Sequence, residues 1–112
     1  MWRHMTGGLT ILVVSADPAR RDAAAMVALA AAALGERVQV FHHADAVRLL
    51  AHADAQGAHL VSEMLAAGIR LIACQTGLAA NEMSFETLAD GCESGGLVSV
   101  LADAREDRLL SF

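Results

Sequence analysis

The sequence predicts an α/β fold, a three-layer sandwich whose mostly parallel sheet has about five strands. Short apolar runs recur along the chain, as in Leu9–Val14 and Ile69–Ala73, and such runs are typical of strands covered on both faces. Between the runs lie segments of helical character that end at glycine, a residue common just after a helix. Because strands alternate with helices, we expect right-handed crossovers and helices on both faces of the sheet.

The length and the charge of the chain limit its organisation. With 112 residues it is long enough for one domain with a core and too short for two. Residues 9–112 are predicted to form that domain, and residues 1–8, which show no periodicity, a flexible lead-in. A net charge of −5 argues against nucleic-acid binding. The longest apolar stretch, Ala23–Leu34, is shorter than the roughly 20 residues that cross a bilayer, so we expect a cytoplasmic protein that does not bind membranes.

The first half of the chain predicts two strands and two helices. Leu9–Val14 is followed by a helix over Pro18–Leu34, capped by Asp17. The apolar stripe of this helix is expected at helical spacing, at Met26, Leu29, Ala30 and Ala33. A second strand is predicted over Arg37–Phe41 and a second helix over His59–Ala67. Between these two elements the sequence has helical character at Ala46–Ala53, and the segment from Asp45 to Gly57 is long enough to be a mobile cover. Gly57 argues against one continuous helix.

The second half predicts three more extended segments. The third strand, Ile69–Ala73, is followed by one helical turn over Thr76–Asn81 and a short helix over Ser84–Ala89 capped by Ser84. Gly91–Gly96 then leads to the last predicted elements, which are a fourth strand, a polar turn and an apolar edge strand, over Leu97–Leu101, Asp103–Asp107 and Arg108–Phe112.

Cys74 is the first residue to suspect of chemistry, because it directly follows the third strand. In open α/β sheets ligands and reactions gather at the carboxyl ends of strands. If a helical turn begins after Cys74, the backbone N–H groups around Gln75 to Gly77 would point toward the sulfur and favour the nucleophilic thiolate. The alternative is a core cysteine beside two ordinary turn residues, Gln75 and Thr76, because free cysteines are often buried.

Further candidates are two histidines and a second thiol. His42 and His43 follow the second strand, and either could pair with the Cys74 thiolate or bind a metal with it. No recognised ligand spacing links these residues, so no metal site is predicted. Cys92 precedes the fourth strand and is expected at the opposite end of the sheet, too far from Cys74 for a disulfide.

No motif in the sequence indicates a cofactor. The residues after the first strand, Ser15–Pro18, lack the glycines of a dinucleotide fingerprint. A Gly-x-Ser-x-Gly nucleophile motif is also missing from the sequence. We therefore predict no cofactor.

Taken together, the order of the pieces resembles one family. The pieces that carry the resemblance are an alanine-rich first helix with Arg20 and Arg21 near its start, the turn Gly35–Val38 into Val40-Phe41, the segment Gly68–Gln75, Gly95-Gly96-Leu97 and the closing Leu109–Phe112. The sequence resembles the DsrE/DsrF-like family, which includes small sulfur-relay subunits related to TusD. The resemblance covers about Leu9 to Phe112 and is most specific at Cys74 with Gln75 behind it. The two arginines are interpreted as surface charges.

The resemblance implies a small α/β sandwich that assembles as a homotrimer or hexamer. It also implies that Cys74 accepts sulfur as a persulfide from a donor protein and passes it to an acceptor, which would make the chain a sulfurtransferase. Two other hypotheses stay open. One is an assembly module without catalysis, and the other is a redox or metal sensor that uses Cys74 with His42 or His43.

Overall fold

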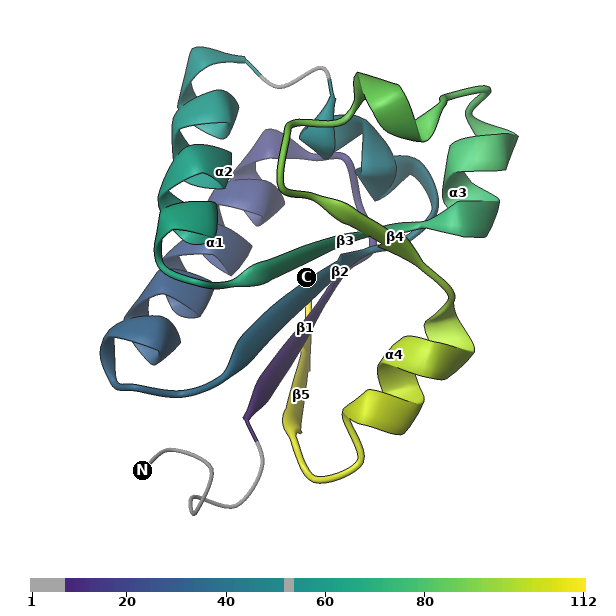
Figure 1. Ribbon diagram of the computed structural model, residues 1–112. Helices are drawn as coiled ribbons and strands as arrows, with labels where there is room; N and C mark the ends of the chain where they lie inside the picture. Colours follow the sequence, from purple (N-terminus) through teal and green to yellow (C-terminus); the bar gives the residue numbers. More distant parts are fainter. Residues whose placement is uncertain (1–7, 52–53) are drawn as a thin grey trace.

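The computed structural model describes residues 8–51 and 54–112 and shows an α/β sandwich built on one five-stranded sheet (Figure 1). All neighbouring strands are parallel, in the order β4-β3-β2-β1-β5. The strands are β1 Leu9–Val13, β2 Val38–His42, β3 Arg70–Cys74, β4 Glu93–Gly95 and β5 Arg108–Ser111. Of the lead-in expected over residues 1–8 only Gly8 is described, and its backbone already bonds to the chain near β5.

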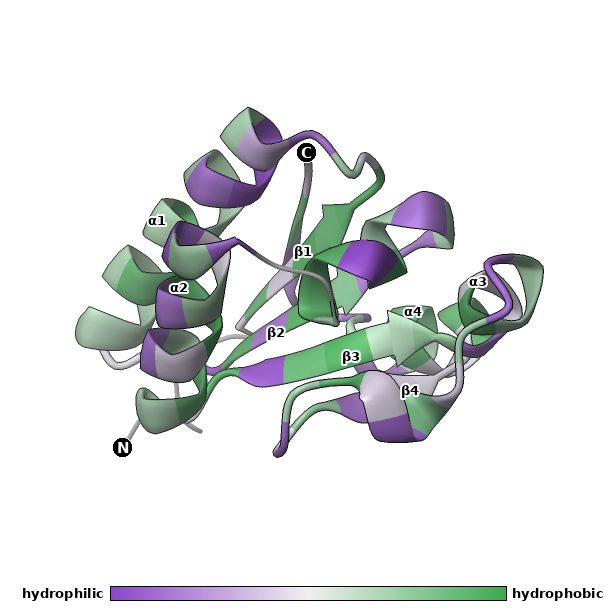
Figure 2. Ribbon diagram, turned by 90° about the horizontal axis from the view of Figure 1, so that it is seen from above, coloured by the Kyte–Doolittle hydropathy of each residue, from purple (hydrophilic) through white to green (hydrophobic). Residues whose placement is uncertain are grey.

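Helices cover both faces of the sheet, as predicted. They are α1 Pro18–Ala33, the 3₁₀ helix η2 Ala44–Leu50, α2 Ala55–Ala66, α3 Gln75–Ala80, the 3₁₀ turn η3 Phe85–Thr87 and α4 Leu97–Asp103. Helices α1 and α2 lie together on one face, and α4 lies on the other (Figure 1). Because β4 and β5 form opposite edges of the sheet, the connection through α4 spans its full width. Figure 2 shows the apolar strands between these layers.

Helix α1 begins and ends as predicted, but its buried face differs. The Asp17 side chain accepts a hydrogen bond from the Ala19 N–H, and Gly35 after the helix has φ +87°. The predicted stripe is wrong: Met26 is 65% exposed. Small residues face the sheet instead, at Ala24, Ala25, Ala28 and Ala31. They follow the same helical spacing, and their lack of bulk lets the helix lie close to the strands.

The fourth strand was predicted in the wrong place. The segment Leu97–Leu101 belongs to helix α4, and β4 is the short segment Glu93–Gly95. The apolar side chains of this segment fit a helix better than a strand, because Val100 and Ala104 are buried four residues apart while Val98 is 84% exposed. The predicted edge strand is confirmed, since β5 pairs with β1 along one side only.

The segment predicted as a mobile cover is packed into the core where it is described. Four side chains of η2 are buried, at Ala46, Val47, Leu49 and Leu50. Helix α2 starts four residues earlier than predicted and contains Gly57, because the Asp54 side chain accepts a hydrogen bond from the Gly57 N–H at 2.7 Å and caps the helix. Residues 52–53 lie outside the described residues.

The two short helices after β3 are present with shifted bounds. Helix α3 begins at Gln75, one residue before the predicted turn, and η3 covers only Phe85–Thr87. Ser84 precedes η3, but its side chain makes no capping hydrogen bond. The predicted cap at Ser84 is therefore wrong.

A row of polar side chains crosses the α4 face of the sheet from one edge to the other. The Asp107 carboxylate accepts hydrogen bonds from the Gly8 N–H and the Thr10 hydroxyl, both at 2.7 Å, and pairs with Arg37 at 2.7 Å. The row continues through Gln39, which donates to Thr10 at 2.9 Å, and ends with Arg70 and Glu93. The Asp107 side chain is only 1% exposed. The row therefore runs from Asp107, just before β5, to Glu93 on β4, with its buried contact between Gln39 and Thr10 and exposed contacts between Arg70 and Glu93.

None of the helices in residues 8–51 and 54–112 combines the length and the apolar character that a bilayer-spanning segment requires.

Candidate functional site

Cys74 is the last residue of β3 and the residue that caps α3. Its φ of −64° and ψ of 122° turn the chain from strand into helix, and its Sγ accepts a hydrogen bond from the Gly77 N–H at 3.3 Å. An N–H donor in this position stabilises a sulfur atom that carries negative charge, as the nucleophilic thiolate does. The turn after β3 thus aims one amide at the sulfur.

Access to this sulfur is narrow, because Cys74 is only 4% exposed. The rate of thiol exchange depends on how easily the other sulfur compound reaches the thiolate. A donor or acceptor must therefore bring its sulfur to this site on a slender group. Gln75 and Thr76, the two residues beside the sulfur in sequence, are exposed and lie on the first turn of α3.

The amide of Gly77 points at the sulfur, as predicted, but the sequence interpretation missed how closely Gly77 packs against Ala44. A Cβ atom on Gly77 would lie 2.8 Å from the Ala44 carbonyl oxygen and 3.1 Å from the Ala44 nitrogen. Such contacts with backbone atoms leave no room for a side chain. Ala44 itself has φ +53°, which is uncommon for a residue with a side chain. The turn after β2 and the turn after β3 are therefore packed directly against each other, and a glycine three residues after the cysteine was the available signal.

The two candidate histidines lie on opposite faces of the sheet. His42 pairs with Ala73 in the ladder between β2 and β3, and alternation along β3 puts Ala73 and Cys74 on different faces. Burial lowers the pKa of His42 to about 4, against smaller upward effects of hydrogen bonds to the Ile72 and Val40 carbonyls. His42 is therefore a neutral core side chain, and its expected place at the rim beside Cys74 is wrong.

His43 shares the face of Cys74. Its ring stacks on Phe41, with the ring centres 6.2 Å apart and the planes inclined by 29°. Phe41 pairs with Ile72, which lies two residues before Cys74 and so on the same face. Of the two candidate histidines, the structure brings only His43 to the side of the sheet where the sulfur lies.

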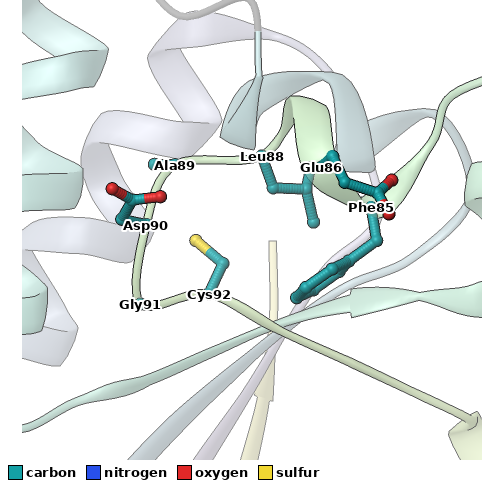
Figure 3. A pocket seen from close by; sticks show the side chains of 7 residues that line it. All are labelled: Phe85, Glu86, Leu88, Ala89, Asp90, Gly91 and Cys92. Carbon is teal, nitrogen blue, oxygen red and sulfur yellow. The ribbon is translucent and has the colours of Figure 1, made fainter.

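Cys92 lines a hollow of about 320 Å³ together with Phe85, Glu86, Leu88, Ala89, Asp90 and Gly91. Its sulfur points into the space that these residues enclose (Figure 3). Burial, with a smaller contribution from the Glu93 charge, raises the pKa of the Cys92 thiol. Such a thiol is a poor nucleophile at neutral pH, because only the thiolate reacts readily. These features suit a structural thiol better than a nucleophile.

The position of Cys92 along the sheet differs from the prediction, although the conclusion about a disulfide holds. Because β4 is short and starts opposite Ile72, Cys92 lies beside the middle of β3 instead of at its far end. Gly95 is opposite Cys74, so the two cysteines are three residues apart along the strand direction, about 10 Å at the usual rise per residue. Both thiols are free.

Arg21 was interpreted as a surface charge, and this is wrong. Its side chain is 7% exposed and pairs with Asp22 at 2.9 Å and with Asp54 at 3.0 Å. Because Asp54 caps α2, the guanidinium joins the first turns of α1 and α2. Arg20, the neighbouring residue, is exposed as predicted.

No group of three or more histidine, cysteine, aspartate or glutamate side chains is arranged to hold a metal ion within the part of the chain that the structure describes. The pair of Cys74 and His42, which was one candidate, is separated by the sheet itself.

Comparison with known proteins agrees with this description. The chain belongs to the DsrE/DsrF-like family, whose model matches residues 9–112. No curated protein matches the sequence.

Several solved structures share the fold. The ychN protein from E. coli superposes with a TM-score of 0.83 at 17% identity, over 95% of this chain and 99% of that one. MTH1491 from Methanobacterium thermoautotrophicum gives 0.80 at 22% identity, over 93% and 97% of the two chains. BT1422 from Bacteroides thetaiotaomicron gives 0.76 at 24% identity, over 93% of each chain. At identities below 25%, these likenesses establish the fold alone.

Proposed function

We propose that this chain is a cytoplasmic sulfur carrier that holds a persulfide on Cys74 and passes the outer sulfur to a thiol of a partner protein. The observation that carries the proposal is the hydrogen bond from the Gly77 N–H to the Cys74 sulfur at the carboxyl end of β3. Support comes from membership of the DsrE/DsrF-like family, since the matching cysteine of its sulfur-relay members has this role. Two free thiols also suit a reducing compartment.

The transfer consists of two exchanges. In the first, the Cys74 thiolate attacks the outer sulfur of a donor persulfide, the S–S bond of the donor breaks, and the donor leaves as a thiolate. In the second, an acceptor thiolate attacks the outer sulfur on Cys74, and Cys74 leaves as a thiolate again. The Gly77 N–H can stabilise the Cys74 sulfur at the start and at the end, when it carries negative charge. No electron donor or metal is required.

Replacement of Cys74 by serine tests the proposal. After incubation with a low-molecular-weight persulfide, we expect mass spectrometry to find an added mass of about 32 Da, one sulfur atom, on Cys74 of the wild-type protein. The adduct should be absent from Cys74→Ser and retained in Cys92→Ser, because the Cys92 thiol is kept protonated by burial. A wild-type Cys74 that stays unmodified, or an adduct found on Cys92 instead, would contradict the proposal.

We also propose that the chain assembles with copies of itself. Apolar side chains are exposed on α4 and β5, at Val98, Leu101, Leu109 and Leu110, and exposed apolar groups of this size favour burial between subunits. The same observation favours the alternative function, an assembly module without catalysis.

Sedimentation equilibrium is expected to give the mass of three or six chains. Replacing Val98 and Leu109 with serine should shift the protein toward one chain, whereas Met26→Ser, at an exposed residue of α1 on the other side of the sheet, should not. A wild-type protein that sediments as a monomer would contradict assembly. A trimer or hexamer whose Cys74 is inert would favour the assembly module over the sulfur carrier.

A further inference from the structure

The Nδ1 atom of His43 is fully buried and has no hydrogen-bond partner among the residues that the structure describes. It is the one buried side-chain nitrogen or oxygen of which this is true there. Nearly all buried polar atoms in proteins are hydrogen-bonded, because losing water without gaining a partner costs free energy. A nitrogen in this state, on the face of the sheet that also carries the Cys74 side chain, needs an explanation in terms of what it binds.

The strand ladder puts His43 beside Cys74. His42, the last residue of β2, lies opposite Ala73, and the next residues along the two chains are His43, still extended and bonded to the Val13 carbonyl, and Cys74. Neighbouring strands are about 4.8 Å apart. The stack of the His43 ring on Phe41 keeps the ring on the face of the sheet where the Cys74 side chain lies.

The turns that follow the two strands hold this arrangement together. The peptide bond between His43 and Ala44 packs closely against Gly77. A Cβ atom on Gly77 would lie 3.1 Å from the Ala44 nitrogen. Gly77 is also the residue whose N–H donates to the Cys74 sulfur. A shift of the His43 backbone would therefore disturb the amide that the sulfur depends on.

We propose that His43 binds the outer sulfur of the persulfide on Cys74 through Nδ1. This inference rests on the proposed function and adds the residue that stabilises its intermediate. An S–S bond of about 2.05 Å extends the Cys74 side chain beyond its own sulfur. After the exchange with the donor, the outer S–H group loses its proton to solvent, and the tautomer of His43 with a proton on Nδ1 donates a hydrogen bond to the negatively charged sulfur.

Two replacements of His43 separate the nitrogen from the ring. His43→Phe keeps a ring that can stack on Phe41 and removes Nδ1, whereas His43→Asn removes the ring and keeps a polar atom near the position of Nδ1. Each protein is loaded with a low-molecular-weight persulfide, and the half-life of the sulfur adduct on Cys74 is followed by mass spectrometry without an acceptor. We expect the half-life to fall about tenfold in His43→Phe, and in His43→Asn to stay within about threefold of the wild type.

Nitrogen NMR of the wild-type protein gives a second readout that does not depend on the variants. The ¹⁵N resonance of His43 Nδ1 is expected to shift when Cys74 is loaded with sulfur, and the resonances of His59, an exposed residue of α2, are expected to stay in place. If His43→Phe does not fold, this shift decides the question.

The experiments distinguish failure of the His43 inference from failure of the proposed function. An unchanged half-life in His43→Phe, or an unchanged His43 resonance after loading, would overturn this inference and leave the sulfur carrier intact, with water as the partner of Nδ1. Failure of the wild-type protein to form any adduct on Cys74 would overturn the proposed function and this inference with it.

Discussion

Replacing Asp107 with alanine is expected to lower the free energy of unfolding by about 3 kcal/mol, because it leaves several groups without their partner. The carboxylate accepts from the Thr10 hydroxyl, which is buried, and from the Gly8 N–H, and it pairs with Arg37. The four residues of β5 are all exposed, so few apolar contacts compensate there. Urea unfolding of the two proteins measures the difference.

The control for this experiment is Glu106→Ala, the same kind of truncation at the preceding residue, whose side chain is exposed. It should change the free energy of unfolding by less than about 0.5 kcal/mol. Hydrogen exchange should also show faster opening of the β1–β5 ladder in Asp107→Ala. The ladder begins where Leu9 pairs with Arg108, and the Asp107 carboxylate binds the residues on either side of Leu9. A loss of less than about 1 kcal/mol in Asp107→Ala would mean that water replaces the carboxylate and that the polar row contributes little.

Acid is expected to destabilise the protein through His42. Burial lowers the pKa of His42 in the folded protein to about 4, whereas in the unfolded chain the value is about 6.5. Above pH 6.5 the residue is neutral in both states and has no effect. As the pH falls from 6.5 to 4, the unfolded chain binds a proton that the folded protein does not, so the free energy of unfolding falls, by about 3 kcal/mol in total.

The measurement compares urea unfolding of the wild type and of His42→Phe between pH 7 and pH 4. The phenylalanine suits a buried strand residue and does not titrate. Other groups, such as Asp54 and Glu93, whose pKa values are lowered by their partners, are present in both proteins and cancel in the difference. Parallel loss of stability in the two proteins over this range would show that His42 is protonated in the folded state.

Much of the fold could be predicted from local signals in the sequence. Asp17 and Gly35 mark the ends of α1, and the apolar runs at β1 and β3 are each displaced by no more than one residue from the observed strands. The segment Leu97–Leu101 could not be assigned in this way, because its β-branched residues suit a strand and only its burial in the folded chain shows helical spacing. Long-range partners, such as those of Asp107, leave no local pattern.

At the candidate site, too, only what local signals in the sequence indicate could be predicted. Cys74 was placed correctly at the end of β3, because a strand followed by polar residues is a local signal. The two histidines were not separated, because both were expected after the second strand, whereas His42 is its last residue and the alternation of a strand sends neighbours to opposite faces. Gly77 owes its importance to Ala44, a residue 33 positions earlier, and such a contact appears only in three dimensions.

The strand order has a consequence for how the chain is made. β1 leaves the ribosome first, yet it lies between β2 and β5, and β5 is the last strand to be synthesised. Until Arg108–Ser111 have emerged, one edge of β1 has no neighbour and its unpaired N–H and C=O groups are free to pair with other extended chains. One edge of the growing sheet therefore stays open to misassembly until β5 has been made.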